Sequence, residues 1–326
     1  MNVLVISHAD VTRLLTMEAC IEVMAAALAA TSRDEAVLPL RSLLWTPDRT
    51  GALGVMPGFL AQPASLGLKI VSIFPGNHGT AYDSHQGIVA LFDTAHGAPL
   101  AILDASSITA IRTAAVSGVA TRALARDDAG DLALLGAGVQ AASHLAAMCA
   151  VRQIRRVRVW SRNPAHAQRF AAASRVPVDV AADPRAAVAG ADLICTTTAA
   201  RTPILEGSWL APGAHINAVG ACLPTARELD AAAVARARLI VDRRESALAE
   251  AGDFLLARAE GAVTDDHIAG ELGDVLVGRV AGRRTPTDIT LFESLGIAIE
   301  DLAAAHYIYT QAVATGAGMS VPLGPA

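Results

Sequence analysis

The chain has 326 residues, of which 53% are hydrophobic and 17% charged, and its formal net charge is −5. This length predicts roughly two domains, and the weakly acidic balance gives no reason to expect a nucleic-acid partner. Alanine supplies much of the hydrophobic content, and the two long uncharged windows, residues 132–151 and 207–226, both contain polar residues, so we expect no membrane span.

The first hundred residues predict one helix and several strands. The apolar series through Ile21, Met24 and Leu28 predicts a helix over residues 10–33. Strands are expected where apolar runs lie between turn residues, at 39–45, 51–57, 65–74, 88–93 and 99–103. We therefore expect a mainly antiparallel α+β unit in this part of the chain.

Lys69 is the single lysine among 26 basic residues, and it lies in the apolar run 66–71. Arginine does not replace lysine where chemistry needs a compact, titratable ammonium. Lys69 is therefore a candidate for a reactive group, although chance retention on an edge strand explains it equally well. Arg41 lies in the predicted strand 39–45, where an exposed edge position is the simpler explanation.

A helix is predicted from Asp104 to about Ala125, with Ile108 and Val119 on its buried side. Arg112 follows Ile108 by four residues and points to the same side. A buried guanidinium needs a partner. The sequence leaves two partners open, a ligand carboxylate or phosphate and an internal Asp or Glu.

A glycine-rich turn follows the apolar strand Leu132–Leu135. The turn, Gly136 to Ala141, has the pattern G-x-G-x-x-A and runs directly into an apolar helix, which is the context of a dinucleotide-binding site. Gly136 permits the tight turn, and Gly138 lets the backbone approach a pyrophosphate at the helix N-terminus. A turn without ligand and a methyltransferase-type Rossmann domain are the alternatives.

The remaining chain alternates strands with helical segments. Strands are expected at 157–160, 176–180, 192–198, 215–220 and 239–242, which predicts a doubly wound parallel sheet. Ser161, Arg162 and Asn163 follow the second strand without an acidic residue, and an arginine there accommodates a ribose 2′-phosphate, so NADP(H) is favoured over NAD(H). A last helix is expected from about Leu291 to Ala314.

The cysteines and the N-terminus indicate the compartment. Four scattered cysteines, Cys20, Cys149, Cys195 and Cys222, have no metal or redox spacing. The apolar run Val3–Ile6 is too short for a signal-peptide core. We therefore expect a cytoplasmic protein without a metal site.

Ten local sequences, in order between about residues 38 and 310, resemble the ornithine cyclodeaminase/mu-crystallin family. Their combination is far more specific than any one of them. They are Gly67–Lys69, Phe74–Asn77, Ser84–Gly87, Leu91–Asp93, Thr109–Ala115, Gly136–Ala141, Ala218–Gly220, Arg227–Asp230, Gly270–Gly273 and Ser294–Gly296.

The resemblance implies an α/β subunit of two parts. Residues 1–108 with 303–326 would form a smaller α+β domain for substrate binding and dimerisation, and residues 109–302 a Rossmann dinucleotide-binding domain. Arg41 and Arg112 would hold the substrate carboxylate, with Lys69 beside the reacting carbon. With the patterns above, the expected cofactor-binding residues are Ser84, Arg112, Thr113, Gly136, Gly138, Val139, Gln140, Ser161, Arg162, Asn163, Thr198, Val219 and Ser294.

One departure bears on the reaction. Ornithine cyclodeaminases carry an aspartate where this chain has Cys222, and a neutral thiol cannot act as a carboxylate base. We therefore expect a homodimeric NAD(P)H-dependent oxidoreductase that reduces a small imine carboxylate, such as Δ1-pyrroline-2-carboxylate, to an amino acid. The alternatives are ornithine cyclodeaminase (ornithine to proline plus ammonia), a related amino-acid dehydrogenase, and a non-catalytic protein that binds NADP(H) and a small ligand.

Overall fold

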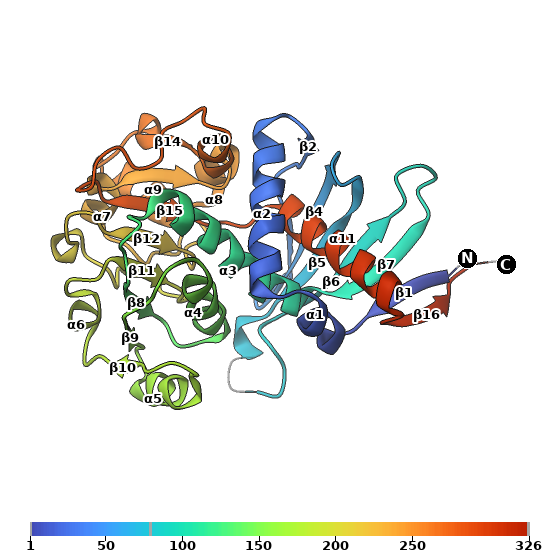
Figure 1. The fold of residues 1–326 in the computed structure, drawn as a ribbon, viewed down its shortest axis with the longest axis horizontal. Coiled ribbons are helices and arrows are strands. Elements are labelled where there is room, and N and C mark those ends of the chain that lie inside the picture. The colour runs from blue at the N-terminus through green and yellow to red at the C-terminus, as the bar shows by residue number, and fades with distance from the viewer. Residues whose placement is uncertain (1, 78–79, 325–326) are drawn as a thin grey trace. The chain divides into compact units, whose positions relative to one another are not determined.

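The computed structural model describes residues 2–77 and 80–324. The chain divides into two compact units (Figure 1). Unit 1 consists of Met1–Arg112 and Ile297–Ala326, and unit 2 of Thr113–Gly296. Unit 2 is thus an insertion between two segments of unit 1, whose blue and red ends in Figure 1 belong to one sheet.

The sheet of unit 1 has the strand order β16-β1-β7-β6-β5-β4-β2, with β3 also paired to β4. Neighbouring strands run antiparallel except β1 and β7, which are parallel. The mainly antiparallel unit expected from the sequence is therefore confirmed. The strands are β1 (Asn2–Ile6), β2 (Ala36–Val37), β3 (Ser42–Trp45), β4 (Ala52–Leu60), β5 (Ser65–Ile73), β6 (His85–Phe92), β7 (Pro99–Asp104) and β16 (Met319–Pro322).

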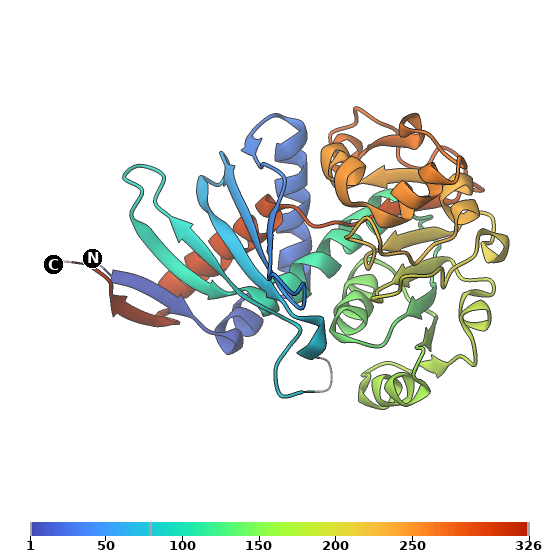
Figure 2. The same cartoon turned by 180° about the vertical axis from the view of Figure 1, so that it is seen from behind.

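Helix α11 (Ala298–Thr315) covers one face of this sheet, and α2 (Met17–Ser32) packs against α11, as Figures 1 and 2 show from opposite sides. Helix α11 packs on β4, β5 and β6. A Cβ atom on Gly67 would lie 2.2 Å from the Ala90 carbonyl oxygen and 2.9 Å from the Leu302 side chain. Glycine in β5 therefore allows α11 to approach the strand closely.

The single N-terminal helix expected over residues 10–33 is wrong. The structure has α1 (His8–Leu14) and α2, and the chain bends by 83° between them. The Thr16 side chain accepts a hydrogen bond from the backbone N–H of Ala19, so it caps the start of the second helix. Among the described residues no single helix is long and apolar enough to cross a membrane; α1 and α2 meet that measure only when taken together.

Helix α3 (Ala105–Leu124) contains the last residue of unit 1, Arg112, and the first of unit 2, Thr113. The Asp104 carboxylate accepts from the Ser107 backbone N–H at 2.8 Å, so Asp104 caps this helix.

Unit 2 is built on a sheet with the order β10-β9-β8-β11-β12-β15-β13-β14, in which all neighbours are parallel. The doubly wound sheet is confirmed, and the strand order reverses between β8 and β11. The strands are β8 (Asp131–Leu135), β9 (Arg156–Trp160), β10 (Asp179–Val180), β11 (Leu193–Thr196), β12 (His215–Ala218), β13 (Arg238–Val241), β14 (Ile268–Glu271) and β15 (Thr290–Glu293). The helices are α4 (Val139–Val151), α5 (Pro164–Ala173), α6 (Pro184–Val188), α7 (Ala231–Arg236), α8 (Arg244–Glu250), α9 (Gly252–Ala259) and α10 (Leu272–Leu276), with short 3₁₀ turns at Pro75–Asn77, Gly207–Trp209 and Asp265–His267.

The long last helix expected from Leu291 is also wrong in its first part. Leu291 lies in β15, between β12 and β13, and α11 begins only at Ala298. Leu291 and Phe292 are both fully buried, as expected for a central parallel strand covered on both faces. Gly296, with φ of +76°, separates this strand from the helix.

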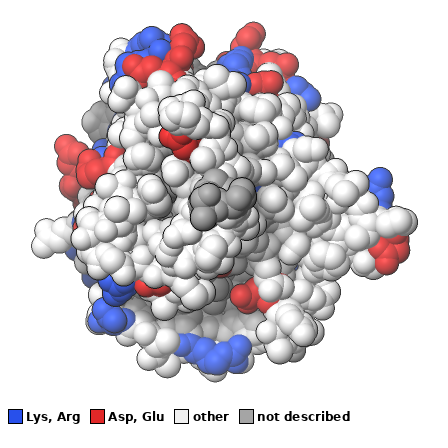
Figure 3. Space-filling model, turned by 90° about the vertical axis from the view of Figure 1, so that its right-hand side faces the viewer, with Lys and Arg blue, Asp and Glu red and all other residues white. Residues whose placement is uncertain are grey.

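The far face of the unit 1 sheet, away from α11, carries exposed apolar side chains. Leu44 and Leu53 are register partners on β3 and β4, and Leu66 and Ile88 extend this face on β5 and β6. On the side of the molecule shown in Figure 3, charged side chains lie mainly near the rim, and neither sign forms a continuous patch.

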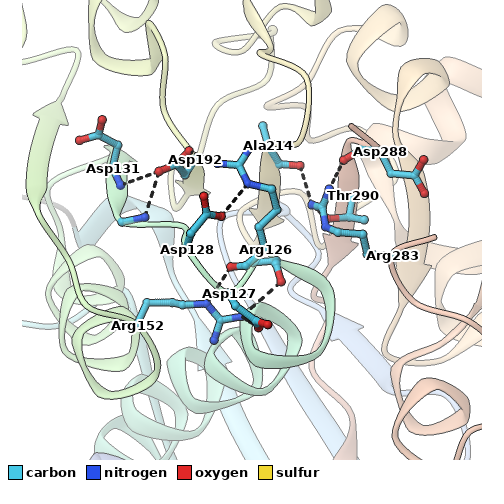
Figure 4. A network of polar contacts seen from close by, with 12 residues as sticks. Arg126, Asp127, Asp128, Asp131, Arg152, Asp192, Ala214, Arg283, Asp288 and Thr290 are labelled. Carbon is cyan, nitrogen blue, oxygen red and sulfur yellow. Dashed lines mark hydrogen bonds and ion pairs between the residues drawn. The ribbon is translucent and has the colours of Figure 1, made fainter. Parts of the chain in front are cut away.

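A network of polar contacts joins the amino ends of the unit 2 strands (Figure 4). Arg126 donates to the Asp192 carboxylate at 2.7 Å, and the other Asp192 oxygen accepts from the backbone N–H of Asp131 at 3.1 Å. Arg283 donates to the Thr290 hydroxyl at 3.0 Å. These contacts fix the sheet at the edge opposite to the carboxyl ends of its strands.

Candidate active site

Lys69 lies in the middle of β5, on the sheet face covered by α11. Its register partners, Met56 on β4 and Val89 on β6, are buried. The Lys69 Nζ lies 2.8 Å from a carboxylate oxygen of Asp301 on α11, and both side chains are buried. Burial lowers the pKa of Lys69 to about 8, while the attraction of Asp301 opposes this change. The ammonium can therefore give up a proton near neutral pH.

Arg112 is held by two acids of α11. Its Nε lies 3.0 Å from the second carboxylate oxygen of Asp301, and one terminal nitrogen lies 2.6 Å from the Glu300 carboxylate. Of the two partners that the sequence left open, the structure shows the internal acids. Burial tends to raise the pKa of Asp301, but Arg112 and Lys69 outweigh it and hold this pKa below its ordinary value.

Sequence reasoning did not name Glu300 or Asp301. The signal was present, because they are two consecutive acids within the otherwise apolar stretch Ile297–Ala305. In an apolar helix segment buried on a sheet, such acids need cationic partners. The structure supplies these partners from β5 and α3.

Arg41 and Ser84 are the other candidates in unit 1. Arg41 is half-buried and directly precedes β3, rather than lying inside it as expected. Its positive charge contributes to the lowered pKa of Lys69, so the two cations are near each other. Ser84 precedes β6, and its hydroxyl lies 3.0 Å from His85 Nδ1.

The expected cofactor residues of unit 2 lie mostly at one edge of its sheet. Gly136, Ser161, Thr198, Val219 and Ser294 follow the carboxyl ends of β8, β9, β11, β12 and β15. Ligands of doubly wound sheets bind at this edge, where the strand order reverses. Thr113, by contrast, is buried in α3.

The turn after β8 has the geometry that a pyrophosphate needs. Gly136 has φ of +120°, and a Cβ there would lie 2.6 Å from the Thr197 hydroxyl, so glycine is required. Gly138 is the N-cap of α4, and a Cβ there would meet nothing within 4 Å. Val139, in the first turn, is 72% exposed, and Gln140 is half-buried. The open helix N-terminus fits a phosphate group.

Arg162 and Asn163, which follow β9, have different surroundings. Arg162 is exposed, and no described residue forms an ion pair with it. The Asn163 side chain accepts from the Ala165 backbone N–H at 3.0 Å and so caps α5. Arg162 is therefore the better placed of the two to meet a ribose phosphate. Within residues 2–77 and 80–324, no group of three His, Cys, Asp or Glu could hold a metal ion.

The model of the ornithine cyclodeaminase/mu-crystallin family matches residues 1–316. The chain belongs to this family. Among its relatives in the family, the mouse (Mus musculus) ketimine reductase mu-crystallin is 44% identical over 271 residues, which cover 83% of this chain and 84% of that protein. A Bacillus cereus Δ1-pyrroline-2-carboxylate reductase is 38% identical over 323 residues, which cover 98% and 99%.

A solved structure of the family matches the whole fold. The Δ1-pyrroline-2-carboxylate reductase of Thermococcus litoralis, in complex with NADH and L-proline, superimposes with a TM-score of 0.95 at 36% identity. The match covers 98% of this chain and 100% of that one.

Proposed function

We propose that this chain is an NAD(P)H-dependent reductase of a small imine carboxylate, such as Δ1-pyrroline-2-carboxylate, and that it forms the corresponding amino acid. The observation that carries the proposal is the buried Lys69–Asp301 pair, which holds a proton donor with a lowered pKa. The activities named for the relatives support the same reaction class.

The residues of unit 1 would manage the proton and the substrate carboxylate. When bound, the reduced dinucleotide supplies the hydride that is added to the imine carbon. The Lys69 ammonium donates its proton to the imine nitrogen, so that the C=N bond becomes CH–NH, and solvent then returns a proton to Lys69. Asp301 holds the ammonium in place. Arg41 would bind the substrate carboxylate through charge-assisted hydrogen bonds, together with Arg112, whose guanidinium Asp301 and Glu300 hold in place.

The dinucleotide would bind along the carboxyl edge of the unit 2 sheet. Gly138, Val139 and Gln140 would hold the pyrophosphate, and Thr198, Val219 and Ser294 would lie near the nicotinamide. Exposed Arg162 supports NADP(H) over NAD(H), because a guanidinium pairs well with a 2′-phosphate.

Cys222 argues against cyclodeamination. Its thiol donates to the Val219 carbonyl at 3.2 Å, at the position where cyclodeaminases carry an aspartate. A preformed imine needs no carboxylate at this position to accept a hydride. We therefore propose imine reduction and not release of ammonia from ornithine.

We further propose that the protein is a dimer that forms through unit 1. The exposed apolar side chains of Leu44, Leu53, Leu66 and Ile88 lie on one face of this sheet, which offers a surface for a second copy. The four cysteines are free thiols, which supports a reducing, cytoplasmic compartment.

The test is NADPH and NADH oxidation by the purified protein with a panel of cyclic imine acids, 2-keto acids plus amines, and ornithine with the oxidised cofactors. We expect turnover with an imine carboxylate and little ammonia release from ornithine, with Cys222→Asp as the matched variant. Rapid release of ammonia from ornithine by the parent protein would contradict the proposal, as would dinucleotide binding without any turnover.

A further inference from the structure

A buried carboxylate, Glu228, joins two neighbouring strand ends in unit 2. One of its oxygens accepts from the backbone N–H and from the hydroxyl of Thr198, both at 2.6 Å. The other accepts from the Thr196 hydroxyl at 2.8 Å and from the Gly220 N–H at 2.7 Å. Thr196 ends β11, and Gly220 follows β12. Glu228 therefore fixes the distance between the ends of these two strands.

The two strand ends are in direct backbone contact beside this carboxylate. A Cβ atom on Gly220 would lie 1.9 Å from the Thr198 carbonyl oxygen and 2.6 Å from the carboxyl carbon of Glu228. No side chain fits at position 220. A displacement of Glu228 must therefore move Thr198 and Gly220 with it.

The four bonds fit a carboxyl group at position 228 and exclude an amide. Each oxygen faces a backbone N–H, which can only donate. An amide would place its NH₂ group against one of these donors, whichever way it is turned. Within the described part of the chain Glu228 forms no ion pair. Burial raises its pKa above the ordinary value, and the four hydrogen-bond donors offset this effect in part.

Two further buried acids support this arrangement. Asp253 on α9 accepts from the backbone N–H groups of Glu228 and Leu229, each at 2.8 Å, and so holds the Glu228 backbone in place. Glu293 ends β15, and its buried carboxylate is near enough to Asp253 for their charges to interact. Burial and the negative charge of Glu228 raise the pKa of Asp253 to about 7, and burial and the charge of Asp253 raise the pKa of Glu293 well above its ordinary value.

The strand order indicates which half of a dinucleotide would lie near the hydrogen bonds of Glu228 to Thr198 and Gly220. The sheet runs β9-β8-β11-β12, and a dinucleotide lies across the point where the order reverses, between β8 and β11. Arg162 after β9 belongs to the adenosine side, so β11 and β12 carry the other side. The Thr198 hydroxyl donates to Glu228, so it is not a donor to a ligand.

We propose that Glu228 is a positioning residue for the nicotinamide end of the dinucleotide, because its hydrogen bonds fix Thr198 and Gly220. This inference rests on the proposed function. It gives a role to the Arg227–Asp230 sequence, which matches the family but which the proposed reaction does not use.

The experiment compares ligands that contain and lack nicotinamide. Isothermal titration calorimetry of the parent and Glu228→Gln would use NADP⁺ and NAD⁺ beside 2′-phospho-ADP-ribose and ADP-ribose. We expect Glu228→Gln to bind the dinucleotides at least about tenfold more weakly, with fragment affinity unchanged and with a lower kcat for imine reduction. The control is Glu260→Gln, at an exposed acid that pairs with Arg227, and this variant should behave as the parent.

Thr196→Val provides a second, milder variant if Glu228→Gln does not fold. It keeps the side-chain shape and removes one of the four donors, so we expect the same selective loss on a smaller scale. Equal losses for dinucleotide and fragment, or parent-like kcat and affinity in both variants, would overturn the inference while the proposed function stands. A parent protein that binds no dinucleotide would overturn both.

Discussion

The Nζ of Lys69 lies 2.8 Å from a carboxylate oxygen of Asp301, although the two residues come from opposite ends of the chain. The same carboxylate pairs with Arg112, so one acid orients two buried cations. The ammonium is thus fixed in position, and its lowered pKa makes it a proton donor near neutral pH.

Replacing Lys69 with methionine should remove this proton donor. General acid catalysis contributes about 10²–10⁴-fold, so we expect imine reduction by Lys69→Met to fall by at least that order, with dinucleotide affinity retained. Steady-state rates and calorimetric titration with NADPH would measure the two effects. Unchanged imine reduction would remove Lys69 from the mechanism.

The pH dependence of imine reduction should follow the ionisation of Lys69. The ammonium form is the donor, and it predominates below its pKa of about 8, so the rate should fall as the pH rises through this value. In Asp301→Asn the attraction that raises this pKa is lost, and the falling limb should move to lower pH. A limb that stays in place in Asp301→Asn would contradict the assignment.

Asp301→Asn should also lower the free energy of unfolding. It leaves two buried cations with an incomplete set of partners, and breaking a buried ion pair costs about 3–5 kcal/mol. Asp179→Asn is the control, because Asp179 forms an exposed pair with Arg156, where the expected loss is below about 1 kcal/mol. Chemical denaturation of both variants would measure the difference. Similar losses would show that the buried pair contributes no more to the free energy of unfolding than the exposed pair.

Arg162→Ala should weaken NADPH far more than NADH. Hydrogen bonds to charged groups contribute about 1.5–3 kcal/mol, which corresponds to roughly a ten- to hundredfold change in NADPH affinity. Arg169→Ala, which removes an exposed arginine from α5, is the matched control. Equal affinities of the parent for the two cofactors would count against a phosphate contact.

Leu44→Glu should convert the proposed dimer to a monomer. Leu44 is 71% exposed on the far face of the unit 1 sheet, and a carboxylate there would be desolvated in an interface. Light scattering of this variant would be compared with that of Val180→Glu, an exposed apolar position in unit 2. If the unsubstituted protein is a monomer at micromolar concentration, the proposed dimer is contradicted.

The parallel sheet of unit 2 was predictable because its strands have local signals. Most of them are short apolar runs, and the glycine turn after β8 indicates the expected ligand edge without reference to distant residues. Strand β14 (Ile268–Glu271) was not predicted, because it contains only two apolar side chains. The errors arose where local patterns are ambiguous. Thr16 starts a new helix inside one apolar series, and Leu291 fits a helical stripe although it lies in a strand. Only tertiary packing decides such cases.

The candidate site was predictable only in part. Lys69 and Arg112 are cations in apolar surroundings, which is unusual enough to be recognised in sequence. Their partners Asp301 and Glu300 lie almost 200 residues or more away, on a helix whose start was misplaced. Glu228 was recognised only as part of a family sequence, because its hydrogen bonds depend on two strand ends meeting.

Because unit 2 is inserted into unit 1, the two units are completed in a fixed order during synthesis at the ribosome. Residues 113–296 can leave the exit tunnel complete, whereas the sheet of unit 1 lacks α11 and β16 until the last segment has been made. Synthesis proceeds at about 5–20 residues per second, so Lys69 exists for roughly 10–50 s before Asp301 has been added. During that interval Lys69 of the nascent chain is exposed to solvent. Its pKa is lowered only after α11 has packed on β5 and buried the side chain.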